Sequence, residues 1–100
     1  MRRLVVILSA MMIGTIGPAG ADLDSAERQL RAGLHEMAAR EFLSEATKGS
    51  AQAMYRLGEL CEQGIGVEQN LLDAKRWYGR AAERGHKPAR ERLKALGERR

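Results

Sequence analysis

Small side chains recur at helical spacing around a glycine-rich turn in the second half of this chain, and this pattern constrains its fold more than any other feature. The positions that carry it are Leu57, Gly58, Gly64, Gly66, Ala74, Trp77, Tyr78, Ala81, Ala82, Gly85 and Ala89. Residues three and four apart share one face of a helix, and small residues there let a second helix approach closely. Glycines between the two helices permit the chain to reverse. The pattern therefore predicts an antiparallel helix pair in which these residues are the packing positions.

The chain after position 21 is expected to be all-α, because no run of residues alternates apolar and polar side chains as a strand would. Five helices are predicted, over about 22–33, 35–48, 51–63, 71–84 and from near Pro88 onward. Asp22 or Asp24, Ser50 and Asn70 are the expected N-caps, and Gly49 fits a left-handed C-terminal cap. The residues expected to face the core are Ala26, Leu30, Leu34, Met37, Ala38, Phe42, Ala46, Ala53, Met54, Leu57, Leu60, Cys61, Ala74, Trp77, Tyr78, Ala81, Ala82, Leu93 and Leu96.

An internal repeat supports this division into helices. A shift of 36 residues superposes Ala38 on Ala74, Gly49 on Gly85 and Leu57 on Leu93, and similar residues meet at several further positions. The repeated unit is a helix, a glycine stop and the next helix, which is typical of stacked helix-pair repeats.

The first 21 residues are predicted to be a cleaved signal peptide and not a part of the fold. Arg2 and Arg3 precede an uncharged apolar stretch, and Ala19-Gly20-Ala21 supplies the small residues of a cleavage site. The alternative is an uncleaved anchor, although the apolar stretch is short for a span of about 20 residues. Residues 22–100 then form one small exported domain, periplasmic or secreted, with no stable membrane insertion after cleavage.

Charge is distributed unevenly along the predicted domain. Residues 22–74 carry five basic and ten acidic side chains, whereas residues 75–100 carry ten basic and three acidic ones. Export argues against a nucleic-acid partner, and no aromatic residues alternate with the late arginines to stack on bases. We interpret the basic third as a solvated helical surface, with contact to an anionic membrane or an acidic partner as the alternative.

No pattern in the sequence predicts catalysis, a cofactor or a metal site. His35 and His86 lack metal-ligand spacing with Cys61, and Gly64-x-Gly66 lacks the strand and the third glycine of a dinucleotide motif. His86 follows a helix stop, which favours a role in the turn. Cys61, the only cysteine, is predicted to be a buried apolar filler, with intermolecular pairing or redox sensing as the alternative. Glu59 and Glu62 are predicted to form a solvated acidic stripe on their helix, because no apolar pocket is indicated that would raise a carboxyl pKa.

The glycine and alanine pattern resembles the Sel1-like repeat family, whose members are related to tetratricopeptide repeats. The resemblance implies a right-handed α-solenoid of about two antiparallel helix pairs, with a degenerate repeat at 23–50, a full repeat at 51–89 and a closing helix at 90–98. Cys61 stands where the family often has tyrosine, and Ser25-Ala26 stand where Leu-Gly is usual. A single cysteine also separates this chain from relatives that carry paired cysteines in each repeat.

The resemblance further implies that the first helix of each pair lines a concave binding surface. The residues it assigns to partner binding are Gln52, Tyr55, Glu59, Glu62 and Gln63, flanked by Glu27, Arg31 and Glu91. We therefore expect a monomeric, non-catalytic module that binds an unidentified protein in the cell envelope, as an adaptor or regulator of a signalling or secretion system. The alternatives are a periplasmic immunity or inhibitor protein and, less favoured, a hydrolase.

Overall fold

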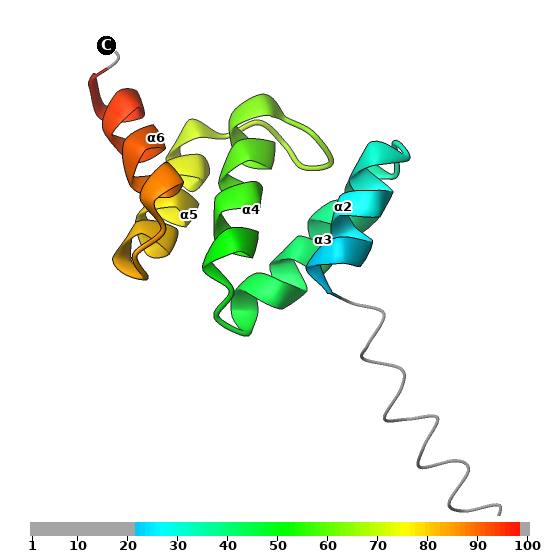
Figure 1. Cartoon of the computed structure of the whole chain (residues 1–100). Helices are drawn as coiled ribbons and strands as arrows, with labels where there is room; N and C mark the ends of the chain where they lie inside the picture. The colour runs from blue at the N-terminus through cyan, green and yellow to red at the C-terminus, as the bar shows by residue number, and fades with distance from the viewer. Residues whose placement is uncertain (1–21, 99–100) are drawn as a thin grey trace, which may run out of the picture.

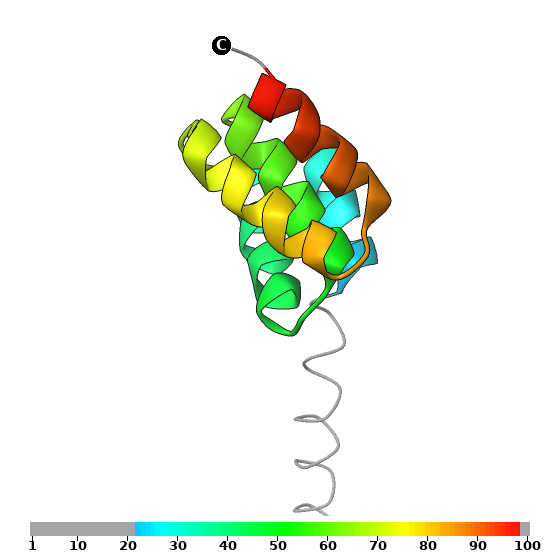
Figure 2. The same ribbon diagram turned by 90° about the vertical axis from the view of Figure 1, so that its left-hand side faces the viewer.

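Two layers of antiparallel helices make up residues 22–98, which are the residues that the computed structural model describes (Figure 1). The helices are α2 (Leu23–Arg31), α3 (His35–Thr47), α4 (Ala51–Gln63), α5 (Leu71–Glu83) and α6 (Lys87–Glu98). Viewed along the stack, α2 and α6 lie on one side of the molecule and α3 and α5 on the other (Figure 2). The described residues contain no strand, so the predicted all-α helical-repeat fold is confirmed. The predicted signal peptide at 1–21 lies outside the described residues.

Polar side chains fix where each helix begins. Asp22 Oδ1 accepts a hydrogen bond from the Ser25 N–H at 2.8 Å, and Asn70 Oδ1 accepts one from the Asp73 N–H at 3.0 Å. Ser50 Oγ accepts from the Ala53 N–H at 3.1 Å, at the start of α4. These side chains satisfy N–H groups that have no partner inside the helix. The caps at Ser50 and Asn70 are therefore confirmed, and of the two candidates at the first helix it is Asp22 that caps.

The loop between α4 and α5 depends on Gly66. Gly66 has a φ of +74°, and a Cβ atom there would lie 2.4 Å from the backbone oxygen of His35. The loop backbone thus lies directly against the first residue of α3, which only glycine permits. This close approach connects the second helix pair to the first.

The core is rich in alanine. The fully buried positions include Ala26, Ala38, Ala53, Ala74, Ala81 and Ala89, and the two largest fully buried side chains are Phe42 and Tyr78. Alanine at these positions lets neighbouring helices lie close together, and the two aromatic rings supply most of the volume of the core.

Several predicted core positions are wrong or only partly buried. Met37 and Leu34 are both 48% exposed, because α2 ends at Arg31 and α3 turns its Ala38-Ala39 face inward. Ala39, which was not among the predicted core residues, is buried in place of Met37. Ala82 and Trp77 are half-buried, and Trp77 packs against the core with one side.

Gly58 is the point of closest approach between α4 and α5. A Cβ atom at Gly58 would lie 2.5 Å from Cε1 and 2.6 Å from Cδ1 of Tyr78. Both residues are buried, so the ring has no space into which it can move. The Leu57-Gly58 and Trp77-Tyr78 pairs of the sequence thus form one contact, in which a tyrosine ring covers a bare helix backbone.

We expect Gly58→Ala to lower the free energy of unfolding by about 1–3 kcal/mol, because the added methyl group overpacks the contact with Tyr78. Helix propensity alone would predict a gain of about 1 kcal/mol for the same change. Urea unfolding followed by circular dichroism measures the difference.

Gly79→Ala is the matched control, since Gly79 is also inside a helix but its nearest neighbour would be Leu93 Cδ2 at 3.9 Å. This change is expected to raise stability by up to about 1 kcal/mol. Equal effects of the two substitutions would show that the Gly58–Tyr78 contact does not limit how α4 and α5 pack.

Candidate functional site

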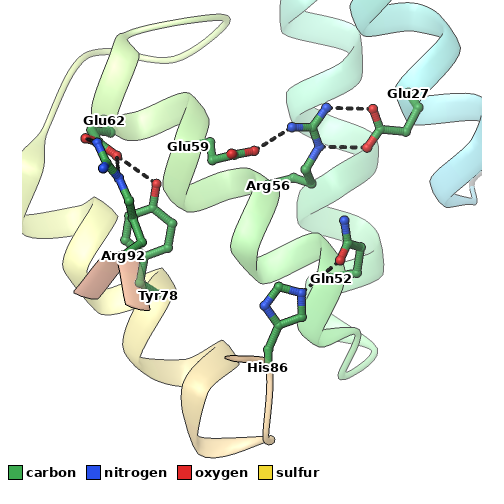
Figure 3. A network of polar contacts seen from close by, with 8 residues as sticks. All are labelled: Glu27, Gln52, Arg56, Glu59, Glu62, Tyr78, His86 and Arg92. Atoms are coloured by element: carbon green, nitrogen blue, oxygen red, sulfur yellow. Dashed lines mark hydrogen bonds and ion pairs between the residues drawn. The ribbon is translucent and has the colours of Figure 1, made fainter. Parts of the chain in front are cut away.

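The predicted partner-binding residues lie on the surface formed by α2, α4 and α6, which we name the α2–α4–α6 face (Figure 3). Gln52, Glu59 and Glu62 project from α4 toward this surface, where side chains of α2 and α6 also lie. Tyr55 of α4 packs beside the rings of His86 and Tyr78. The three remaining predicted residues that flank this group, Gln63, Arg31 and Glu91, are exposed. The structure therefore brings the central predicted residues together, but it gives them neighbours that the sequence did not indicate.

Arg56 joins α2 to α4 at one end of the face. Its Nε and Nη2 atoms each donate a hydrogen bond to a carboxylate oxygen of Glu27, both at 2.7 Å, and its Nη1 donates to Glu59. The hydrogen bonds to Glu27 are the largest cause that raises the pKa of Arg56, so its charge is permanent. Paired, two-pronged contacts of this kind are among the stronger side-chain interactions in proteins.

Glu62 joins α4 to both α5 and α6 at the other end of the face. The buried hydroxyl of Tyr78 donates a hydrogen bond to Glu62 Oε1 at 2.8 Å. Arg92 donates to the same oxygen from Nε at 3.0 Å and to Oε2 from Nη2. Burial first, and then the hydrogen bond to Glu62, raise the pKa of Tyr78, so the hydroxyl stays protonated as a donor. The Glu62 side chain is only 10% exposed.

Tyr55 lies at the centre of the face between two other rings. Its ring centroid is 4.8 Å from that of His86 and 5.7 Å from that of Tyr78. Tyr55 remains half-exposed, and desolvation is the largest cause that raises its pKa. An aromatic side chain that is held in place while part of it faces solvent is typical of a binding anchor.

His86 fixes both Gln52 and the start of α6. Its Nδ1 accepts a hydrogen bond from the Ala89 N–H at 3.2 Å, and its Nε2 lies 2.9 Å from Gln52 Oε1. Since Nδ1 accepts, the proton of the neutral ring lies on Nε2, which donates to Gln52. The predicted turn role of His86 thus has a physical basis as the cap of α6.

The prediction of a solvated acidic stripe is wrong. Glu59 and Glu62 are both paired with arginines, and the Glu59 side chain is 26% exposed. Arg92, assigned from the sequence to a basic outer surface with no bearing on this face, is the partner of Glu62. Arg56 and His86 were also missed as members of the face. Their partners Glu27 and Gln52 lie 29 and 34 residues away in the sequence, so no local pattern could have indicated these contacts.

Residues 22–98 offer no arrangement of side chains for metal binding. Within that range, no three His, Cys, Asp or Glu side chains lie where they could hold a metal ion together. None of the helices described there is both long and apolar enough to span a bilayer. Burial raises the pKa of the Cys61 thiol, which disfavours its reactive thiolate form.

Residues 51–86 match the sequence model of the Sel1 repeat. The chain therefore contains a Sel1 repeat. A solved Sel1 repeat protein from Oxalobacter formigenes has the same fold, with a TM-score of 0.66 and 28% identity over 88% of this chain and 40% of that one. Sel1 repeats are protein–protein interaction modules.

Curated relatives share only a short stretch with this Sel1-like chain. "DAP3-binding cell death enhancer 1" of Rattus norvegicus is 38% identical over 61 residues, which are 61% of this chain and 12% of that protein. "Chitin synthase regulator SKT5" of Malassezia restricta is 47% identical over 51 residues, which are 51% of this chain and 4% of that protein. The chain therefore spans a small part of the length of these relatives, and the similarity concerns the repeat itself.

We expect Arg92→Met to lower the free energy of unfolding by about 1 kcal/mol, because it removes the ion pair between α6 and the nearly buried Glu62 carboxylate. The Arg92 side chain is 42% exposed, which screens the ion pair and keeps the effect small. Chemical unfolding at low and high salt measures the loss and its screening.

Arg90→Met is the control, because Arg90 is exposed on the same helix and, within the described chain, no carboxylate forms an ion pair with it. Its effect is expected to be below about 0.5 kcal/mol. If both substitutions are equally mild, the Glu62–Arg92 contact does not help to hold α6 on the repeat.

Proposed function

We propose that this Sel1-like repeat protein is a non-catalytic adaptor or regulator that binds a protein partner in the cell envelope through its α2–α4–α6 face. One observation carries the proposal: Tyr55 is held half-exposed between His86 and Tyr78, at the centre of a face whose charged groups are already paired. An ordered aromatic anchor loses little conformational entropy when a partner covers it. When a partner covers a face whose charged groups are already paired, the cost of removing water from those groups is also smaller.

The printed names of the relatives support a regulatory role. They include a chitin synthase regulator, a chitin synthase regulatory factor and a DAP3-binding protein, each of which is far longer than this chain. This chain shares sequence with those proteins, and we infer that its repeat serves as a binding unit with a regulatory role.

Catalysis is not part of the proposal. Hydrolysis by a cysteine needs an accessible thiolate beside a base, whereas Cys61 is buried and its pKa is raised by that burial. His86, a candidate base, is engaged with Gln52 and with the cap of α6. Cys61 and His86 thus have structural roles.

We also propose that the protein is exported and that its signal peptide is cleaved after Ala21. The basic residues at positions 2 and 3, the apolar stretch and the Ala19-Gly20-Ala21 ending support it. We expect the intact mass of the protein recovered from the periplasm or medium to correspond to a chain that begins at Asp22. Recovery of the full-length chain in the inner membrane would show an uncleaved anchor instead.

Binding at the α2–α4–α6 face is tested with the partner that cross-linked affinity purification recovers from envelope extract. We expect Tyr55→Ala to weaken binding by roughly tenfold, as the loss of an aromatic anchor does. Leu72→Ala, an exposed apolar position of α5 outside this face, is the control and is expected to bind as the unmodified protein does.

Circular dichroism and thermal melting establish that Tyr55→Ala is folded at the temperature of the titration. Unchanged affinity of a folded Tyr55→Ala protein would contradict a binding role for this face. An enzyme or toxin recovered as the partner, and inhibited by the pure protein, would identify the chain as an inhibitor and not an adaptor.

A further inference from the structure

A groove runs along the side of the molecule opposite the α2–α4–α6 face. It lies between α3 and α5, and α4 forms its floor; we name it the α3–α5 groove. Two hollows of 460 and 500 Å³ make up this groove, and Trp77 borders both of them. Figure 2 shows α3 and α5 on the side of the molecule that lies away from α2 and α6.

One hollow of the groove is apolar. Leu43 of α3 and Val67 of the loop line it together with Leu57, Cys61 and Trp77. Leu43 is 45% exposed on the rim, and Trp77 is half-buried. Tryptophan is a residue type on which binding energy concentrates in protein interfaces, and the exposed leucine adds apolar surface beside it.

The groove has the shape that a helix requires. On α4, Met54, Leu57 and Cys61 follow one another at steps of three and four residues, and the α3 wall repeats this spacing through Leu43 and two alanines. Such stripes run along the helix axis, so the floor and one wall of the groove each present a row of apolar side chains. An elongated slot between two helices accommodates the apolar stripe of a third helix.

Arginines that border the α3–α5 groove are not paired with carboxylates of the described chain. Arg40 borders the apolar hollow, and Arg80 and Arg84 border the second one. In the described part of the chain none of these three arginines forms an ion pair with a carboxylate, and Arg80 stacks over Trp77 at 5.2 Å. Glu36 and Glu83 also line the hollows, so the rim has a net positive charge. The α2–α4–α6 face differs in that Arg56 and Arg92 are both paired with carboxylates within the chain.

We propose that the α3–α5 groove binds an amphipathic helix of a partner protein, whose apolar stripe is flanked by Asp and Glu side chains. Apolar residues of that helix enter the hollow beside Trp77, and its carboxylates pair with Arg40, Arg80 and Arg84. The α3–α5 groove is separate from the α2–α4–α6 face, so a partner can bind to one surface while the other is unoccupied.

Two single residues of the chain report on this groove. Trp77 is the only tryptophan, so its fluorescence changes when a ligand covers it. Cys61 is the only cysteine and lies on the floor, so a bound helix slows its reaction with a maleimide. The full chain is titrated with two stapled helical peptides of about 16 residues, long enough for about four turns. The peptides share one leucine stripe and differ only in whether Glu or Lys flanks it.

We expect the Glu-flanked peptide to shift Trp77 fluorescence, to slow Cys61 labelling and to bind about tenfold more tightly than the Lys-flanked peptide at low salt. Arg40→Glu and the pair Arg80→Glu and Arg84→Glu are each expected to reduce or reverse that preference. Lys87→Glu with Lys94→Glu, which changes the net charge equally at exposed positions of α6, is expected to leave the preference intact.

The apolar part of the groove is tested by Leu43→Ala, which is expected to weaken the Glu-flanked peptide about fivefold. Leu72→Ala is the matched control, because Leu72 is also an exposed leucine and lies outside both hollows. Tyr55→Ala is expected to leave peptide binding unchanged, so failure of this proposal and failure of the proposed function are distinguishable.

Equal binding of the two peptides, or binding of neither, would overturn the proposal. Cys61 labelling that becomes faster when residues 1–21 are removed would show that this segment of the chain occupies the groove. Labelling that becomes slower with protein concentration alone would assign the groove to a second copy of the chain. Each of these results excludes an acidic partner helix as the occupant.

Discussion

The contact between Gly58 and Tyr78 is the constraint on which the rest of the structure depends. The missing side chain of Gly58 lets the Tyr78 ring lie on the backbone of α4, since any Cβ atom there would overlap the ring. From that position the Tyr78 hydroxyl reaches Glu62, and Glu62 in turn holds Arg92 of α6. One close approach therefore fixes α5 directly and orients α6 through two polar contacts.

The two sides of α4 show opposite uses of charge. On the α2–α4–α6 face, Glu27 and Glu62 each meet an arginine of another helix, so charge is used to hold the repeat together. Along the α3–α5 groove, Arg40, Arg80 and Arg84 have no carboxylate partner among the described residues. Paired charges order a surface but attract a charged partner only weakly. Unpaired charges at the rim of a groove steer an oppositely charged partner toward it.

The features predicted correctly from the sequence are local. Ser50 and Asn70 cap their helices because the side chain and the N–H it binds are three residues apart, a distance that a sequence pattern can show. The resemblance to Sel1-like repeats implied which residues of α4 face the same surface, but the pairing of their charges could not be predicted, because Glu62 and Arg92 are 30 residues apart. Met37 was misplaced for a similar reason: the spacing marks an apolar face, but only packing decides which of two adjacent faces is covered.

Helix α4 belongs to both surfaces, and this arrangement bears on how an adaptor could work. Tyr55, three residues before Gly58, packs beside the rings of His86 and Tyr78. Met54 and Leu57 instead line the α3–α5 groove. The opposite sides of a single helix thus present an aromatic anchor and an apolar floor, with the rigid Gly58–Tyr78 contact between them. Because α4 is packed against both α3 and α5, occupation of one surface need not distort the other. Two partners can then be held at a fixed distance by a single repeat, which is the physical requirement for a small protein that brings other proteins together.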